Sequence, residues 1–338
     1  MPVWNDLGVA FNTLREIDVA AIRAESERPV TIIGFGARRL VERAAALLRL
    51  QGVQRYGPAG ADPIVYRPLS AAALDEDVRR ADLLLIVLDA RAPLAVSEAA
   101  TLARLADLAL PTTIVIVGAS VANPGPPRPE FAHAHIMTLP ELAAATANQL
   151  ASSLIERLPG EKHLAAARRL PGLRHGYARD LVGAVSFANA TYALSSAIPE
   201  QIPALALPFV VADIIVLTKN QSLMVYRLAL AHGAEPEFSA RMREILPVIG
   251  GGFLWRQTAR SLASLIPIWG VVPKVAIAYA GTYTTGVAAW RWFADSEILS
   301  RARLEELSNE AMRLGRERAQ ALVEAARRRT APPDEPRG

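Results

Sequence analysis

Short apolar runs alternate with longer amphipathic stretches over the first half of the chain. The runs at Val30 to Ile33, Asp82 to Ala90 and Thr113 to Gly118 are largely apolar at successive positions, which is typical of strands buried on both faces of a parallel sheet. Shorter strands are predicted at Ile64 to Tyr66 and at His135 to Thr138. The helices predicted between and after the strands cover residues 37–50, 71–80, 97–108 and 141–158. This alternation predicts a three-layer α/β domain that ends near Pro159.

Strand signals fade after Lys162, and long helical patterns replace them. Two strongly apolar regions, Ile202 to Thr218 and Leu262 to Trp290, lie in this half. At the other end, Asp6 is a candidate cap for an amphipathic helix that ends before Pro29. The predicted domains are an N-terminal amphipathic helix (1–28), an α/β domain (29–160), a helical domain (161–294), a charged C-terminal helix (295–330) and a disordered tail (331–338).

The charged C-terminal helix carries apolar residues at heptad positions, namely Leu304, Leu307, Ala311 and Leu314. Arg318 then falls where the next core residue of a coiled coil would stand. Because the seam stops there, we expect a short helix packed against its own domain instead of a coiled coil.

Composition narrows the classes of function. The 338 residues exceed what one core usually organises, and with 51% hydrophobic and 21% charged residues the chain suits two folded domains and permits a membrane contact. Arginine-rich stretches at residues 38–43, 168–179 and 327–329 point only weakly to an acidic partner, since the net charge is +4. Aromatic residues, 6% of the chain, are not interleaved with these stretches, which argues against nucleic-acid binding.

The chain contains no cysteine, which excludes disulfides, thiolate nucleophiles and cysteine metal sites. The absence of cysteine also fits a reducing compartment. The N-terminal segment is acidic and amphipathic and lacks the pattern of a secretory signal.

A predicted strand, a turn at Gly34-Phe35-Gly36 and a predicted helix follow one another in the order of a phosphate-binding loop, where backbone amides attract anions. The P-loop pattern is G-x-x-x-x-G-K-[ST]. Counted from Gly34, Arg39 stands at the second glycine, Leu40 at the lysine and Val41 at the hydroxyl residue. The dinucleotide pattern G-x-G-x-x-G also fails at Arg39.

The rest of the predicted sheet indicates GTPase ancestry without the corresponding signatures. The acid and glycine of a D-x-x-G loop are missing from VYRPLSAAAL, and TTIVIVG continues into Gly118-Ala119-Ser120-Val121 instead of the guanine-reading N-K-x-D. Hydrolysis therefore has no visible lysine, magnesium ligand or water-orienting loop. We expect no catalytic residue, no metal and no cofactor, GTP included.

A few polar residues stay candidates for other sites. Gly34, Gly36, Arg38 and Arg39 form a candidate anion site at a helix start, and the competing interpretation is a solvated basic face near Glu42. Asp89, at a strand end, faces a cleft or caps the following loop. His133 and His135 have the spacing of metal ligands on a strand, but no acid cluster accompanies them, so a surface loop is expected.

Three stretches of the second half carry a family resemblance. They are RRLPGLRHGYARDLVGAVSFANATYAL, LPFVVADIIVLTKNQSLMVYRLALAHG and ILPVIGGGFLWRQTARSLASLIPIWGVVPKVAIAYAGTYTTGVAAWRWF. Their succession, from Leu164 to Phe293, resembles the helical domain of unknown-function family 697. The resemblance implies a membrane-associated helical domain that follows a small GTPase-like domain. Because the GTPase signatures upstream are degenerate, the resemblance does not imply an active GTPase.

Neither apolar region is a simple membrane span. A spanning helix needs about 20 apolar residues, whereas Ile202 to Thr218 is shorter and contains Asp213, and the longer region contains Lys274. Basic residues on both sides also conflict with the positive-inside rule for a single span. Two arrangements stay open: a hairpin of Ile245 to Trp255 with Leu262 to Trp290 that dips into the membrane, and the buried helices of a soluble bundle. The residues that suit either a membrane interface or an aromatic core are Trp255, Trp269, Trp290 and Trp292.

Together these patterns predict a P-loop-GTPase-like three-layer parallel-sheet domain followed by a helical, partly membrane-associated domain. The predicted function is that of a non-catalytic, membrane-associated pseudo-GTPase-like protein with a binding or scaffolding role. We expect it on the cytoplasmic face of a membrane, with lipid as a partner, no nucleic acid, and a protein partner that the sequence does not identify. Two alternatives stay open: an NTP-binding or hydrolysing GTPase-like protein with an atypical phosphate loop, and a soluble, cytoplasmic helical interaction protein.

Overall fold

The computed structural model describes residues 18–49, 56–69, 74–119, 125–126, 129–131, 134–196, 203–237, 240 and 271–330, with side chains except at 203–214 and 326–330. Contacts within the chain define an α/β unit, Ala20–Ala178 with Leu230–Pro236, and a helical unit, Arg179–Ala229 with Met1–Val19 and Glu237–Gly338. The domain limits proposed from the sequence stay predictions. Of the predicted leading helix, the structure describes α2 (Ala20–Glu27), whereas Asp6 lies outside the described residues. The tail at 331–338 lies outside them as well.

A five-stranded parallel sheet forms the centre of the α/β unit, in the order β2-β1-β3-β4-β5. The strands are β1 (Ile32–Gly36), β2 (Ile64–Pro68), β3 (Leu83–Asp89), β4 (Thr112–Val117) and β5 (Ala134–Leu139). All side chains of β3 from Leu83 to Leu88 are buried, as expected for a strand covered on both faces. The predicted arrangement of an α/β domain with a parallel sheet, followed by helices, is confirmed.

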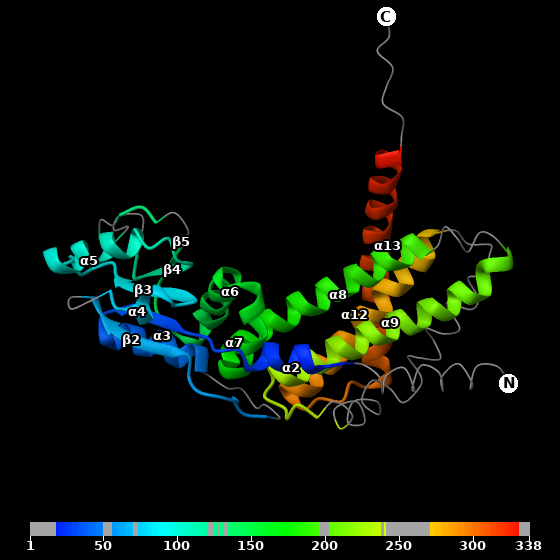
Figure 1. Ribbon diagram of the computed structural model, residues 1–338, viewed down its shortest axis with the longest axis horizontal. Coiled ribbons are helices and arrows are strands. Elements are labelled where there is room, and N and C mark those ends of the chain that lie inside the picture. The colour runs from blue at the N-terminus through cyan, green and yellow to red at the C-terminus, as the bar shows by residue number, and fades with distance from the viewer. Residues whose placement is uncertain are drawn as a thin grey trace, which may run out of the picture. The chain divides into compact units, whose positions relative to one another are not determined.

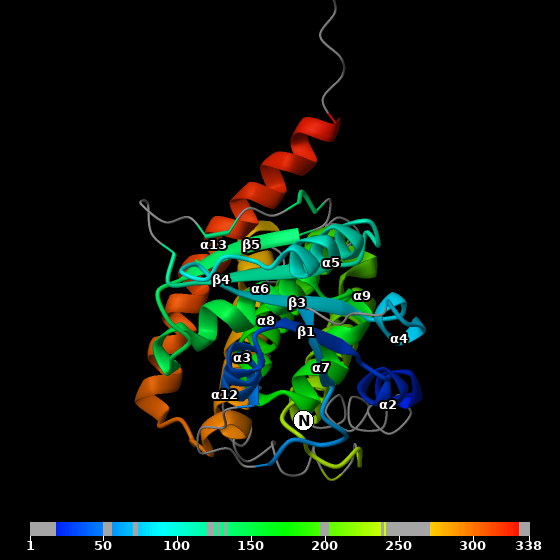
Figure 2. The same ribbon diagram turned by 90° about the vertical axis from the view of Figure 1, so that its left-hand side faces the viewer.

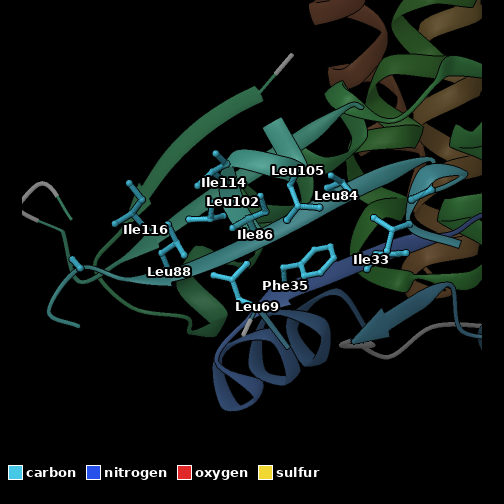
Figure 3. Packing of buried hydrophobic residues seen from close by; sticks show 13 residues of the cluster. Ile33, Phe35, Leu69, Leu84, Ile86, Leu88, Leu102, Leu105, Ile114 and Ile116 are labelled. Carbon is cyan, nitrogen blue, oxygen red and sulfur yellow. The ribbon is translucent and has the colours of Figure 1, made fainter. Parts of the chain in front are cut away.

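Helices cover both faces of this sheet (Figure 1, Figure 2). They are α3 (Arg38–Arg49), α4 (Glu76–Arg79), α5 (Val96–Ala106) and α6 (Ala147–Arg157). Helix α7 (His163–Arg169) packs against α2 instead, and single turns lie at Ala144–Thr146, Gly160–Lys162 and Pro171–Leu173. On one face, Phe35 and Ile86 pack with Leu102 and Leu105 of α5 (Figure 3). Helices α3 and α6 contact the sheet as well, and Val41 and Leu154 are buried.

Two predicted boundaries are wrong for identifiable reasons. The predicted turn at Gly34-Phe35-Gly36 is the end of β1, because all three residues pair in register with β3. Of the helix predicted over 71–80, residues 71–73 lie outside the described part, residues 74 and 75 are not helical, and α4 covers Glu76–Arg79. The carboxylate of Asp75 accepts a hydrogen bond from the Val78 amide at 3.1 Å and so caps the helix that begins at Glu76.

The helical unit contains long helices, namely α8 (Arg174–Ser196, of which the first residues belong to the α/β unit), α9 (Pro203–Ala231), α12 (Val271–Asp295) and α13 (Arg301–Thr330). Helices α12 and α13 pack against each other, and a Cβ atom at Gly315 would stand only 2.6 Å from the carbonyl oxygen of Ala276. Ala311 and Ala319 are buried while Arg318 is exposed. Helix α13 thus packs on its own domain as predicted, but with 30 residues from Arg301 it is not the short helix that was expected.

Within the part of the chain that the structure describes, no helix combines the length and the apolar character needed to cross a bilayer.

Candidate functional site

Strand β1 is joined to helix α3 by a single residue, Ala37. The carbonyl oxygen of Ala37 accepts hydrogen bonds from the amides of Leu40 at 2.9 Å and Val41 at 3.1 Å, so helical hydrogen bonding begins directly after the strand. A P-loop instead places a stretch of loop residues between its glycines, and this loop surrounds the phosphate with amides. The connection here has no such stretch.

Gly34 and Gly36 allow neighbouring elements to approach β1 closely. A Cβ atom at Gly34 would overlap Cγ1 of Val41, and one at Gly36 would overlap the carbonyl oxygen of Val87. Gly36 also has a φ of +137°, a conformation that L side chains rarely adopt. The glycines that suggest a phosphate loop in the sequence therefore serve the packing of α3 and β3.

The first turn of α3 carries the two arginines of the candidate anion site. Arg38 Nε donates to Glu42 Oε1 at 2.7 Å, and the Arg38 guanidinium lies 5.3 Å from the centre of the Tyr66 ring. Arg38, Arg39 and Glu42 are all exposed. An exposed ion pair contributes at most about 1 kcal/mol, so the geometry fits the solvated basic face better than an anion site. Anion binding at Gly34, Gly36, Arg38 and Arg39 stays a prediction.

The carboxyl edge between β1 and β3 is the place where doubly wound folds bind ligands. Asp89 lies there, and its carboxylate accepts a hydrogen bond from the Arg91 amide at 2.9 Å, which closes the next loop. A Cβ atom at Gly125 would stand 2.8 Å from Cγ2 of Ile116 and 3.9 Å from Cα of Ala90, so this later segment packs on the same edge. Asp89 thus has the structural role of a loop cap.

Only one residue of the histidine pair lies among the described residues. His135 lies on β5 and is partly buried, whereas His133 lies outside the described residues. Among the residues that the structure describes, no group of three or more histidine, aspartate or glutamate side chains is placed to hold a metal ion. The described neighbourhood of His135 therefore adds no support for a metal site.

A buried arginine, which sequence reasoning missed, organises the α/β unit. Arg174 is 1% exposed, and its guanidinium donates to the carbonyl oxygens of Ala167 at 3.1 Å, Tyr56 at 3.1 Å and Gly57 at 3.0 Å. Burial, and then the charge of Arg168, lower the pKa of Arg174 to about 10. Ala167 is only seven residues away, but Tyr56 and Gly57 are more than 100 residues away in the sequence, so no local pattern reveals them.

Arg168 and Arg169 hold the ends of two other helices. Arg168 Nη1 donates to the carbonyl oxygens of Leu230 at 2.9 Å and Ala234 at 2.8 Å, at the end of α9. Arg169 Nη2 donates to the Glu27 carbonyl oxygen at 3.2 Å, at the end of α2. Terminal helix carbonyls lack intrahelical donors and carry partial negative charge, so a cation is favourable there. This basic stretch is thus largely engaged inside its own unit.

Polar side chains gather in the core of the helical unit where α8, α9 and α12 meet. Asn189 Nδ2 donates to Thr282 Oγ1 at 2.9 Å, and Asn189 Oδ1 accepts from Asn220 Nδ2 at 2.7 Å. Gln221 Nε2 donates to the same Thr282 oxygen at 3.1 Å, while the Thr282 hydroxyl donates to the Ala278 carbonyl at 2.8 Å. Asn and Gln in SFANATY and VLTKNQS, within long helical patterns, are the sequence signal that could have revealed this cluster.

Lys274, inside the second apolar region, is buried in the same unit. Its Nζ donates to Ser196 Oγ at 3.0 Å, at the last residue of α8. A cation at the C-terminal end of a helix interacts favourably with the helix dipole. Lys274 is therefore accommodated inside the fold.

Of the predicted membrane-contact residues, Trp290 and Trp292 lie near the end of α12 and are partly buried. Phe293, next to them, is fully buried. Trp255 and Trp269 lie outside the described residues. Membrane contact through these tryptophans stays a prediction.

Comparison with models of protein families, with curated proteins and with solved structures finds no match to this chain. The resemblance to family 697 therefore stays a prediction.

Proposed function

We propose that this protein is a non-catalytic, membrane-associated binding protein whose GTPase-like α/β domain acts as a scaffold. The observation that carries the non-catalytic part is the connection of β1 to α3 through Ala37 alone. A phosphate loop needs backbone amides that point into an open anion-binding concavity. Here helix α3 begins directly after the strand, so no loop residues form such a concavity.

The side chains at this connection support the same proposal. Val41, at the position of the P-loop hydroxyl, is 1% exposed and packs against Gly34. A magnesium-binding hydroxyl at this position would have to leave the core. Leu40, at the position of the lysine, brings no charge to a phosphate.

A GTPase-like origin of the sheet remains part of the proposal. The order β2-β1-β3-β4-β5 is also that of flavodoxin-like folds, which bind their ligand between β1 and β3. What favours the GTPase-like interpretation is the family resemblance of the second half, since the turn after β4 lacks the N-K-x-D residues.

The membrane part of the proposal rests on the distribution of polarity in the helical unit. Its core contains Asn189, Gln221 and Thr282, whereas Phe187 of α8 is 46% exposed. A bundle surrounded by water normally has polar side chains outside and large apolar ones inside. Helices that pack in lipid more often join through small and hydrogen-bonding residues.

Calorimetric titration of the full chain with GTP and Mg²⁺ tests the non-catalytic part. We expect no saturable heat of binding, which means that any dissociation constant for GTP is weaker than about 1 mM. Saturable binding would overturn this part in favour of an atypical nucleotide site. In that event the Arg38→Ala/Arg39→Ala variant shows whether the first turn of α3 holds the phosphates.

Flotation with phosphatidylcholine vesicles, with and without phosphatidylglycerol, tests the membrane part. We expect the native full chain to float with vesicles after a wash in high salt, because apolar contacts resist salt while purely electrostatic ones are screened. Complete recovery in the unfloated fraction with both vesicle types would favour the soluble interaction protein.

A further inference from the structure

From Leu181 to Ser196, helix α8 has an exposed face without any charged residue, and the exposed ion pair of Arg179 with Asp180 lies directly before it. The exposed residues between Leu181 and Ser196, which we call the outer α8 face, are Ala184, Phe187, Ala188, Thr191 and Ser195. No residue from Leu181 to Ser196 is charged, inside or outside, so this stretch of about 24 Å of helix offers water only weakly polar surface. Phe187, 46% exposed, is the largest side chain on the face.

The hydroxyl groups on this face are turned back to the helix itself. Thr191 Oγ1 donates to the Phe187 carbonyl at 3.0 Å, and Ser195 Oγ donates to the Tyr192 carbonyl at 2.8 Å. Both side chains thus satisfy their donors within the helix, as serine and threonine often do. Apart from these two hydroxyl oxygens, the side chains of the face are the methyl groups of Ala184, Ala188 and Thr191 and the ring of Phe187.

The opposite face of α8 is where the strongly polar side chains lie. Asn189 and Ser186 are 0% exposed; Asn189 bonds to Thr282, and Ser186 Oγ donates to the Val182 carbonyl at 2.7 Å. For a helix at a water boundary the asparagine would lie outside and the phenylalanine inside. The polarity of α8 is therefore reversed relative to a water-facing helix.

We propose that the outer α8 face lies against the acyl chains of a lipid bilayer. A stretch of about 24 Å is shorter than the roughly 30 Å of a hydrocarbon core, so the contact is with the outer part of one leaflet and not a crossing. Lipid is favoured over a protein partner because the face offers no charge and no outward hydrogen-bond donor, the groups that give protein interfaces their specificity.

This inference deepens the proposed membrane association and depends on it. Single cysteines test it directly, since the chain has no cysteine of its own. Ala184→Cys and Ala188→Cys place a nitroxide label on the outer α8 face. Ala302→Cys at an exposed position of α13 and Ala46→Cys at an exposed position of α3 are matched controls. Collisions with oxygen, which concentrates in acyl chains, are compared with collisions with a water-soluble nickel chelate.

With phosphatidylcholine vesicles present, we expect labels at 184 and 188 to gain oxygen accessibility and lose nickel accessibility, while labels at 302 and 46 keep both. If the chain floats with vesicles but labels 184 and 188 stay open to nickel, the inference about α8 is wrong and the membrane association stands. If the chain does not float at all, the proposed association itself fails. Protection of 184 and 188 without vesicles would assign the face to a second copy of the chain.

A charge on the face gives an independent test. Ala188→Glu should weaken the partitioning into vesicles at least about tenfold, because a carboxylate is costly in hydrocarbon. Ala302→Glu, on an exposed position of the same unit, should leave partitioning unchanged. Circular dichroism that matches the unaltered chain separates this effect from misfolding. Equal partitioning of both variants would contradict the lipid contact.

Discussion

Arg174 Nη2 donates a hydrogen bond of 3.0 Å to the carbonyl oxygen of Gly57, and Gly233 packs against the same oxygen. The φ of Gly233 is +90°. A Cβ atom at Gly233 would overlap this carbonyl. The segment after α3 and the turn after α9 therefore meet at one buried guanidinium. The Arg174 guanidinium is thus part of the buried core of the α/β unit.

Replacing Arg174 should lower the free energy of unfolding of the α/β unit. In Arg174→Met, the carbonyl oxygens of Ala167, Tyr56 and Gly57 lose a buried donor, which should cost about 2–4 kcal/mol of unfolding free energy. Urea denaturation followed by circular dichroism measures the loss. Arg179→Met is the control, since Arg179 is exposed beside Asp180 and should change stability by less than about 0.5 kcal/mol. Equal midpoints for the two variants would contradict the role assigned to Arg174.

The contact of Gly34 with Val41 predicts a coupled pair. Gly34→Ala should destabilise the chain by about 1–3 kcal/mol, because the added methyl overlaps Cγ1 of Val41. Val41→Ala removes that atom, so the double variant should recover part of the loss, with a coupling energy of at least about 0.5 kcal/mol. Chemical denaturation of the four proteins in the cycle gives this value. Purely additive effects would show that Gly34 is not required for the close approach of α3.

Two helix glycines of the helical unit should respond in opposite ways to alanine. At Gly286 the new Cβ would stand 2.7 Å from Val182 Cγ2 and 3.0 Å from Met224 Cε, whereas Gly183 has open space. Alanine brings the same gain in helix propensity at both positions, so their difference of about 1–3 kcal/mol reports packing alone. Thermal unfolding should place Gly183→Ala at or above the unaltered chain and Gly286→Ala below it. The reverse order would mean that α8 and α12 do not pack through Gly286.

Tyr283 predicts a loss of stability in alkali. Burial first, then Tyr279 and Glu310, raise the pKa of Tyr283 above its ordinary value, and the two tyrosine rings stack with centroids 6.0 Å apart. The folded state then binds more protons than the unfolded state above about pH 10, so stability is full below that pH and falls as pH rises through the folded pKa. Tyr283→Phe should lose less stability between pH 9 and pH 11 than the unaltered chain. Urea midpoints at both pH values measure this, and a parallel fall of both proteins would refute it.

Sequence patterns are sufficient for the sheet because its signal is local. The apolar runs of β3 and β4 are long and rich in branched side chains, and a strand covered on both faces needs nothing more. The glycines of β1 mislead the same reasoning, since Gly-x-Gly also marks turns. Only the register with β3 and the position of Val41 distinguish the two cases, and both depend on residues distant in the chain.

The candidate site was predictable in its chemistry and not in its geometry. The sequence alone places Arg39, Leu40 and Val41 where a P-loop needs glycine, lysine and a hydroxyl. That the connection is a single residue follows from where α3 begins, and strand and helix propensities leave such limits open by a few residues. Arg174 was beyond reach because charged residues are normally exposed and the carbonyl oxygens it binds have no sequence signature.

The single-residue connection between β1 and α3 also limits how this chain could acquire a phosphate site by evolution or by engineering. Writing lysine and serine at positions 40 and 41 would put the new hydroxyl under Gly34, in the core, and would add no amide nest. Nucleotide binding would first need an insertion that lengthens the backbone between strand and helix, and only afterwards the familiar side chains. What prevents phosphate binding here is the length of the connection between β1 and α3, which point substitutions do not change.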